Sequence, residues 1–120
     1  MNEFTPARVK PLGGIESREA LDIRVGTIER VEEIPGSEKL MKLSVNFGDQ
    51  SRTILAGIKK ERDNPREIEG RQALFVVNLK PRKMAGEVSE GMLFDIGFAD
   101  GVRPALCVPE RAVPDGTRAG

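Results

Sequence analysis

The stretch NPREIEGRQALFVVN, which runs from Asn64 to Asn78, decides the fold of this chain. Its first residues carry helix signals, because Asn64 is a good N-cap residue and Pro65 suits the first helical position. Gly70 is the residue type that commonly ends a helix. The segment from Arg71 to Asn78 is the most apolar of the strand-like segments, which is typical of a buried strand. The stretch therefore predicts one short helix followed directly by a strand.

Strand signals dominate the rest of the sequence. Apolar and polar side chains alternate in the segments before the quoted stretch, as they do in half-buried strands. A turn with hairpin spacing separates the second of these segments from the third. The expected strands are residues 22–31, 41–47, 52–56, 71–78 and 92–96, with a sixth short strand at 104–108.

Five short strands with a helix between the third and the fourth form the element order of an OB-fold, a five-stranded Greek-key barrel. We therefore expect an all-β protein, in which a short helix joins strands 3 and 4 and terminal extensions flank the barrel. A βαβ unit is the alternative. It is disfavoured because one short helix cannot cover both faces of a parallel sheet.

The division into domains follows from the same signals. Residues 1–14 are rich in proline and glycine, which predicts a flexible N-terminal arm. Residues 15–120 are expected to form the OB-fold domain. Near its start, Ser17 is expected to cap a short helix that extends to Ala20 or Leu21.

Composition and charge limit the kinds of molecule that this chain is expected to bind. The chain has 120 residues, and 19 lysines plus arginines balance 19 aspartates plus glutamates. The segment from Lys39 to Lys60 nevertheless holds five cations against one acid, which predicts a surface with one basic side. The alternative is an ordinary set of solvated charges. Because no signal peptide and no apolar run of membrane-spanning length are present, we expect a cytoplasmic protein without a membrane partner.

The residues that commonly perform catalysis are missing. The chain has no histidine and a single cysteine, Cys107. The usual general base and the commonest metal ligand are therefore absent, and neither Ser89 nor Cys107 has a histidine partner for nucleophilic catalysis. No glycine-rich phosphate loop is present. We expect a binding protein with no enzymatic activity, no cofactor and no metal site.

A basic loop follows the quoted stretch. Lys80, Arg82 and Lys83 lie between Asn78 and Gly86 with no acidic residue among them. A rigid strand end that presents an amide and three cations predicts a site for an anionic ligand. Single-stranded nucleic acid is commonly held by stacking on aromatic side chains, and this chain has no Trp and no Tyr. That absence favours the backbone and shape of folded RNA as the ligand.

Five sequence blocks occur in order along nearly the whole chain. They are Asp22–Gly26, Gly36–Leu43, Arg52–Gly57, Val77–Gly86 and Ser89–Leu93. Together they resemble the tRNA-binding domain at the C-terminus of bacterial methionyl-tRNA synthetases. This domain also occurs in small stand-alone tRNA-binding proteins and in the endothelial-monocyte-activating cytokine precursor. The resemblance implies an OB-fold homodimer that recognises tRNA by shape rather than by sequence.

The resemblance also implies roles for individual residues. The expected tRNA-binding residues are Asn78 and Ser89 as hydrogen-bonding groups, Arg82 and Lys83 as phosphate contacts beside Lys80, Met92 as a flexible apolar contact, and Lys39 and Lys42 as outer electrostatic contacts. Simpler alternatives stay open. Asn78 can cap a strand end, Ser89 can serve a turn, Met92 can belong to the core, and the cations can be merely solvated.

Partners beyond tRNA follow from the same resemblance. The protein is expected to assist an aminoacyl-tRNA synthetase and to dimerise through the segment from Pro104 to Thr117. The alternative is a CsaA-type export chaperone, which shares the fold and binds unfolded polypeptides. That branch usually carries a different strand where this chain has Arg52–Gly57, and it tends to lack the pair Gly91-Met92. The sequence therefore favours the tRNA-binding branch.

Overall fold

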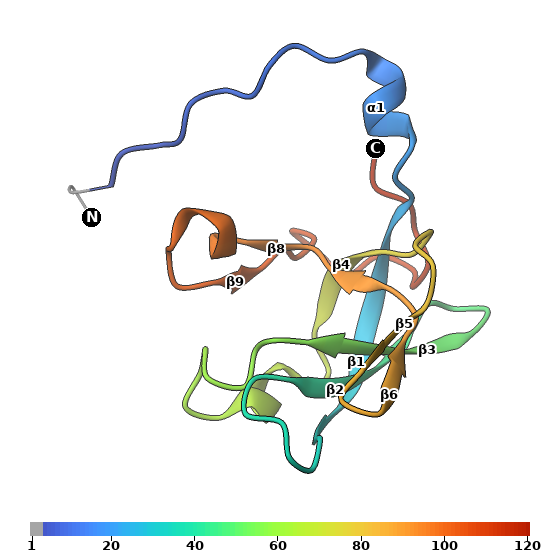
Figure 1. The fold of residues 1–120 in the computed structure, drawn as a ribbon. Coiled ribbons are helices and arrows are strands. Elements are labelled where there is room, and N and C mark those ends of the chain that lie inside the picture. Colours follow the sequence, from blue (N-terminus) through green and yellow to red (C-terminus); the bar gives the residue numbers. More distant parts are fainter. Residues whose placement is uncertain (1–3) are drawn as a thin grey trace.

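The computed structural model describes residues 4–120, and its centre is a curled five-stranded antiparallel sheet (Figure 1). The strand order is β3-β2-β1-β4-β7. The strands are β1 (Ile23–Glu33), β2 (Met41–Asn46), β3 (Ser51–Ala56), β4 (Gln72–Val76) and β7 (Met92–Leu93). This arrangement, with a short helix between β3 and β4, confirms the predicted all-β OB-fold.

β1 is long because it pairs with two neighbouring strands, one along each half of its length. Its first half, from Ile23 to Thr27, pairs with β4, and its second half, from Thr27 to Glu33, pairs with β2, with an irregularity in that pairing between Ile28 and Arg30. Gly26 lies where the strand crosses the core, and a Cβ atom there would meet Val45 Cγ1 at 2.5 Å. A glycine is therefore required at this crossing, which lets the sheet curl around the core.

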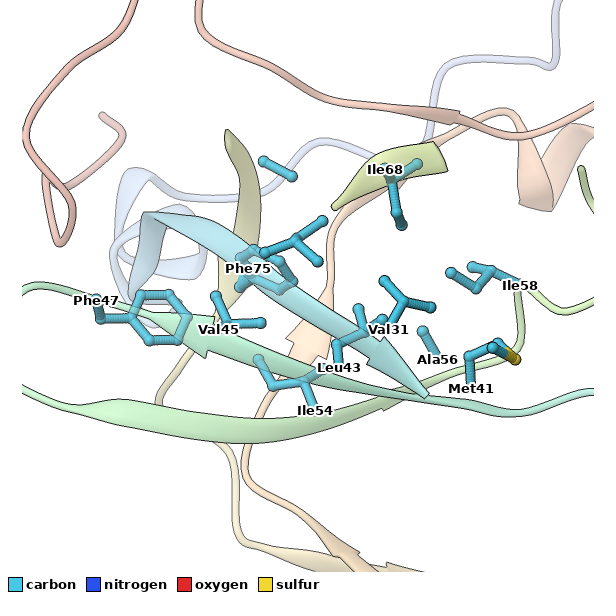
Figure 2. Close-up of a cluster of buried hydrophobic side chains, with 12 residues drawn as sticks. Val31, Met41, Leu43, Val45, Phe47, Ile54, Ala56, Ile58, Ile68 and Phe75 are labelled. Carbon is cyan, nitrogen blue, oxygen red and sulfur yellow. The ribbon is translucent and has the colours of Figure 1, made fainter. Parts of the chain in front are cut away.

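The core fills the concave side of this sheet (Figure 2). The alternation predicted for β2 is confirmed, because Met41, Leu43 and Val45 point inward and are at most 2% exposed. Phe47 and Phe75 also lie in the core, with ring centroids 5.6 Å apart in an edge-to-face arrangement. Burial of each such side chain stabilises the fold by about 1.5–3 kcal/mol.

The helix between β3 and β4 is a single 3₁₀ turn, η1 (Pro65–Ile68). Asn64 is its N-cap as predicted, since its side chain accepts a hydrogen bond from the Arg66 N–H at 3.2 Å. Gly70 follows it with a φ of 87°, a conformation that favours glycine. Ile68 is buried from this turn and joins the core (Figure 2), so η1 covers one end of the barrel.

Two short hairpins complete the structure. One consists of β5 (Arg82–Met84) and β6 (Glu87–Ser89), in a region predicted as a loop. The other consists of β8 (Asp95–Ile96) and β9 (Ala105–Leu106), joined through the 3₁₀ turn η2 (Phe98–Asp100). The expected strand at 92–96 is therefore divided between β7 and β8, which belong to different sheets, and β9 is the expected sixth strand.

The C-terminal segment and the helix that precedes β1 both lie near the start of β1 (Figure 1). The helix α1 (Ile15–Glu19) begins two residues before Ser17, so the prediction that Ser17 caps it is wrong; Gly14 is the N-cap. At the other end, the Val25 N–H donates to Thr117 O at 2.8 Å and the Ala119 N–H donates to Ile23 O at 2.8 Å. The C-terminus thus extends the sheet along β1 and ends near α1 (Figure 1).

The segment before α1 has no regular secondary structure between residues 4 and 14, and its side chains are exposed. Residues 1–3 of the predicted arm lie outside the described residues, and the flexibility of the arm stays a prediction. Among residues 4–120, no helix is both long enough and apolar enough to span a membrane.

Candidate nucleic-acid interface

The β5–β6 hairpin presents the cations that the sequence singled out. Its turn contains Ala85 and Gly86, both with positive φ, which matches the backbone twist of a tight hairpin. Lys80, Arg82 and Lys83 are exposed, and within residues 4–120 no carboxylate lies within 4.0 Å of their charged groups. We call these three residues the basic hairpin set. They form a cluster of positive charge that nothing in the described chain neutralises.

Ser89 fastens this hairpin to the barrel. Its side chain is only 3% exposed. The Ser89 hydroxyl accepts a hydrogen bond from the Leu55 N–H at 2.9 Å and donates one to Gly91 O at 3.0 Å. The hydroxyl is therefore fully used within the protein, and it replaces a missing strand partner along β3.

Glu90 and Arg52 add further hydrogen bonds between β3 and the residues on either side of the hairpin. The Glu90 N–H donates to Thr53 O at 2.8 Å, and its carboxylate accepts from the Thr53 N–H at 3.0 Å. Arg52 Nη1 donates to Val77 O at 2.7 Å and to Glu90 O at 3.0 Å. Arg52 thus holds the end of β4 beside the hairpin, and its guanidinium carbon lies 6.0 Å from the ring centroid of Phe47. Sequence reasoning gave Arg52 no such role, since nothing local marks an arginine that binds two distant carbonyl groups.

Asn78 fastens the other side of the site. Its Oδ1 accepts from the Asp22 N–H at 2.8 Å, and its Nδ2 donates to Ala20 O at 2.8 Å. Asn78 therefore connects the end of β4 to the residues between α1 and β1. Both functions of its amide are used, which places the start of the basic loop in one fixed position.

Asp22 extends this connection to the C-terminus. Its carboxylate accepts two hydrogen bonds from the Arg24 guanidinium at 2.7 and 2.9 Å, and one from Arg118 Nε at 3.1 Å. The Arg24 hydrogen bonds, aided by Arg118, lower the pKa of Asp22 from its ordinary 3.8 to about 2. The carboxylate therefore stays ionised at neutral pH and holds Arg118 of the C-terminal segment against the start of β1.

The remaining predicted contacts lie in different places. Lys42 joins the hairpin, because its Nζ lies 3.4 Å from Glu87 Oε1 on β6. Lys39 lies on the loop between β1 and β2 and is exposed. Met92 is 51% exposed, which excludes the alternative that it belongs to the core.

The broad basic side expected between Lys39 and Lys60 is only partly present. Lys59 Nζ lies 3.2 Å from Glu33 Oε1, and Lys60 Nζ lies 3.6 Å from Glu38 Oε1. With Lys42 paired as well, these acids neutralise much of the charge that the linear count suggested. Exposed pairs of this kind contribute little stability, but they reduce the field that reaches a ligand. Lys80, Arg82 and Lys83 differ from these residues, because no carboxylate in residues 4–120 pairs with them.

A hollow of about 210 Å³ lies beneath Met92. Its lining is mainly apolar, and it includes Leu55, Leu93 and Phe98 as well as two carboxyl groups, Glu61 and Asp95. Burial raises the pKa of Asp95, and burial together with the nearby Asp95 charge raises the pKa of Glu61.

Comparison with known proteins places this geometry among related chains. Residues 23–118 match the family model described as "Putative tRNA binding domain". The fold is similar to that of a MetRS-related protein from Pyrococcus horikoshii, with a TM-score of 0.84 and 36% sequence identity over 92% of this chain and 100% of that chain.

Two further solved structures have a related fold. One is the chaperone CsaA from Bacillus anthracis, with a TM-score of 0.79 and 31% identity over 92% of this chain and 100% of that chain. The other is the C-terminal domain of Plasmodium vivax p43, with a TM-score of 0.74 and 32% identity over 82% of this chain and 58% of that chain.

Proposed function

Because this chain belongs to the tRNA-binding domain family, we propose that it is a non-catalytic protein that binds folded tRNA through the basic hairpin set. The observation that supports this proposal most strongly is the set of three exposed cations, Lys80, Arg82 and Lys83, with no carboxylate of residues 4–120 within 4.0 Å of their charged groups. Phosphate groups are the ligands that such a cluster attracts, and they give binding that depends on salt but not on sequence.

The positions of the other predicted residues suggest that these residues have different roles in tRNA binding. Lys39 and Lys42 add outer electrostatic attraction, and Met92 offers an apolar contact. RNA hydrogen bonds from Asn78 and Ser89 stay predictions. In the structure both side chains bond within the chain, which supports a role in holding the basic hairpin set in place.

We also propose a homodimer that works beside an aminoacyl-tRNA synthetase in the cytoplasm. The β8–β9 hairpin and the two residues after it include exposed apolar side chains that a second copy could cover. They are Ile96, Phe98, Val102 and Val108. Only part of the expected interface from Pro104 to Thr117 is available for this, because its last residues already bond to β1. A dimer would present two basic hairpin sets to one tRNA and so raise the affinity.

The test is filter binding of bulk tRNA across a salt series. Wild type is compared with R82Q/K83Q and with the control R30Q/K60Q, which removes equal charge from exposed cations that are paired with Glu32 and Glu38. The expected result is salt-sensitive binding that R82Q/K83Q weakens and the control leaves nearly unchanged. Equal loss in both variants, or binding that does not depend on salt, would reject this site.

A second candidate function is binding of unfolded polypeptide, and the hollow beneath Met92 is the observation that favours it. Its apolar lining suits an apolar side chain, and Glu61 and Asp95 suit a neighbouring cation. An unfolded polypeptide and an unstructured RNA, added as competitors in the same assay, separate the two functions. Displacement by polypeptide with little dependence on salt would favour this second candidate.

A further inference from the structure

A second group of arginines surrounds a hollow on another part of the molecule. The hollow has a volume of about 370 Å³ and lies between η1 and the start of β9. Arg62, Arg71 and Arg103 line it together with one acidic residue, Glu67, so its lining carries three positive charges against one negative charge. β9 lies well away from the β5–β6 hairpin in Figure 1, and the hollow is therefore separate from the basic hairpin set.

Two of these arginines are held in place by the surrounding chain. The Arg62 side chain is only 10% exposed, and its Nη1 lies 3.5 Å from Glu61 Oε1 while its Nε lies 3.6 Å from Glu67 Oε2. Arg103 Nε donates to the backbone carbonyl oxygen of Glu61 at 3.2 Å. That single bond orients the Arg103 guanidinium and does not neutralise its charge.

Arg71 and Arg103 have no acidic partner. Both are exposed, and within residues 4–120 no carboxylate lies within 4.0 Å of either guanidinium group. Arg66 and Arg111 nearby differ in this respect, because each is paired with a glutamate, Glu69 or Glu110. Like charges that gather around one hollow repel each other, and an anion in the hollow would relieve that repulsion.

The chemistry of the lining identifies the anion. A guanidinium group presents planar pairs of N–H donors that match two oxygens of a phosphate, and it is less strongly hydrated than an ammonium group. The contacts of Arg62 with its glutamates are long, so a phosphate oxygen can compete for the same donors. We propose that this arginine hollow is a second phosphate-binding site, which takes a phosphodiester group of the RNA that the basic hairpin set binds.

This inference rests on the proposed function, since it assigns a second contact for the same RNA. Two cationic sites on separate parts of a rigid barrel suit a folded, extended polyanion better than a small free anion. Each phosphate contact changes the slope of log affinity against log salt by about 0.7–0.9. Loss of the arginine hollow, which takes one phosphodiester group, should therefore reduce that slope by about 0.7–0.9.

The first experiment compares the salt dependence of tRNA binding in four proteins: wild type, R71Q/R103Q, R82Q/K83Q and the control R30Q/K60Q. We expect R71Q/R103Q to reduce the slope by about 0.7–0.9, with an unchanged melting temperature. A slope in R71Q/R103Q equal to that of the control would overturn the inference while the proposed function, tested by R82Q/K83Q, stands.

The second experiment does not depend on tRNA. Inorganic pyrophosphate is titrated into ¹⁵N-labelled protein, and the arginine Nε–H signals are followed by NMR. Saturable shifts of the Arg62 and Arg103 signals, lost in R71Q, support the phosphate site; if wild type fails to bind tRNA, the proposed function and the assignment of this site to RNA fail, while the phosphate site itself stands. No shift, or a shift caused only by an acidic peptide, would overturn the inference.

Discussion

The β5–β6 hairpin and the β8–β9 hairpin both project from the barrel, and they differ in attachment and in the side chains that they expose. Hydrogen bonds of Ser89 and Glu90 attach the first hairpin to β3, and the exposed residues of this hairpin include cations. The second hairpin pairs mainly with itself, and its outer surface carries apolar side chains such as Phe98, which is 71% exposed.

The electrostatic environments of the two regions differ in the same way. At the start of β1, where Asn78 anchors the loop that leads to the first hairpin, Arg24 and Arg118 lower the pKa of Asp22. Beside the second, burial raises the pKa of Asp95. The first region therefore stabilises charge and suits a charged ligand, whereas the second disfavours charge and suits an apolar partner. This contrast supports assigning RNA to the basic hairpin set and a second protein copy to the exposed apolar side chains of the second hairpin.

The largest expected effect is on RNA binding at the first hairpin. Removal of all three charges in K80Q/R82Q/K83Q should weaken tRNA binding roughly 100-fold near 0.1 M salt, because three phosphate contacts are lost. The measurement is filter binding, with circular dichroism to verify the fold. An affinity within about threefold of wild type would show that the cations are merely solvated.

The next effect concerns the attachment of this hairpin. Ser89→Ala leaves the buried Leu55 N–H without its acceptor, which should cost about 1–3 kcal/mol of unfolding free energy. Urea unfolding measures this cost. The control is Ser51→Ala, at an exposed position on β3, the strand that contains Leu55. Unchanged stability combined with a large loss of tRNA affinity would instead indicate that the Ser89 hydroxyl contacts RNA directly.

A smaller effect is expected at the second hairpin. Phe98→Asp should weaken self-association about tenfold or more, because an apolar side chain that would be covered in a dimer is replaced by a charge. Sedimentation at micromolar concentration measures the change, and Gln50→Asp, which adds the same charge at an exposed position between β2 and β3, is the control. A wild-type protein that is monomeric under these conditions would refute the dimer itself.

The sequence predicted the parts of the molecule that depend on local pattern. The alternation in β2 and the Asn64-Pro65 start of η1 are both reproduced, because burial period and helix capping are set by neighbouring residues. The β5–β6 hairpin was missed, since its turn uses Ala85 and Gly86 rather than the usual Asn-Gly or Asp-Gly pair.

The candidate site was less predictable, because its geometry depends on residues that are far apart in the sequence. The positions of Asn78 and Ser89 followed from motif resemblance, but their partners, Ala20 and Leu55, are distant along the chain. The neutralisation of Lys59 by Glu33 has the same origin. A linear count of charges cannot show which cations keep their charge unpaired, and only the folded chain shows that the basic hairpin set does.

The smallest expected effects concern how the stability of the folded protein depends on pH through Asp22 and Asp95. The Asp22 carboxylate has a lowered pKa in the folded protein, so its contribution to stability is present above its ordinary pKa of 3.8 and is lost as the pH falls through about 2. Asp95 has a raised pKa, so folding is favoured when it is protonated and this advantage is lost as the pH rises through its folded pKa.

At pH 7, Asp22→Asn should therefore destabilise the protein and Asp95→Asn should stabilise it. Thermal unfolding of both variants between pH 2.5 and 7 measures the difference, with the exposed Asp63→Asn as control. Shifts of the same sign for both variants would show that the surroundings of Asp22 and Asp95 do not differ in this way, and would contradict the electrostatic contrast drawn between them.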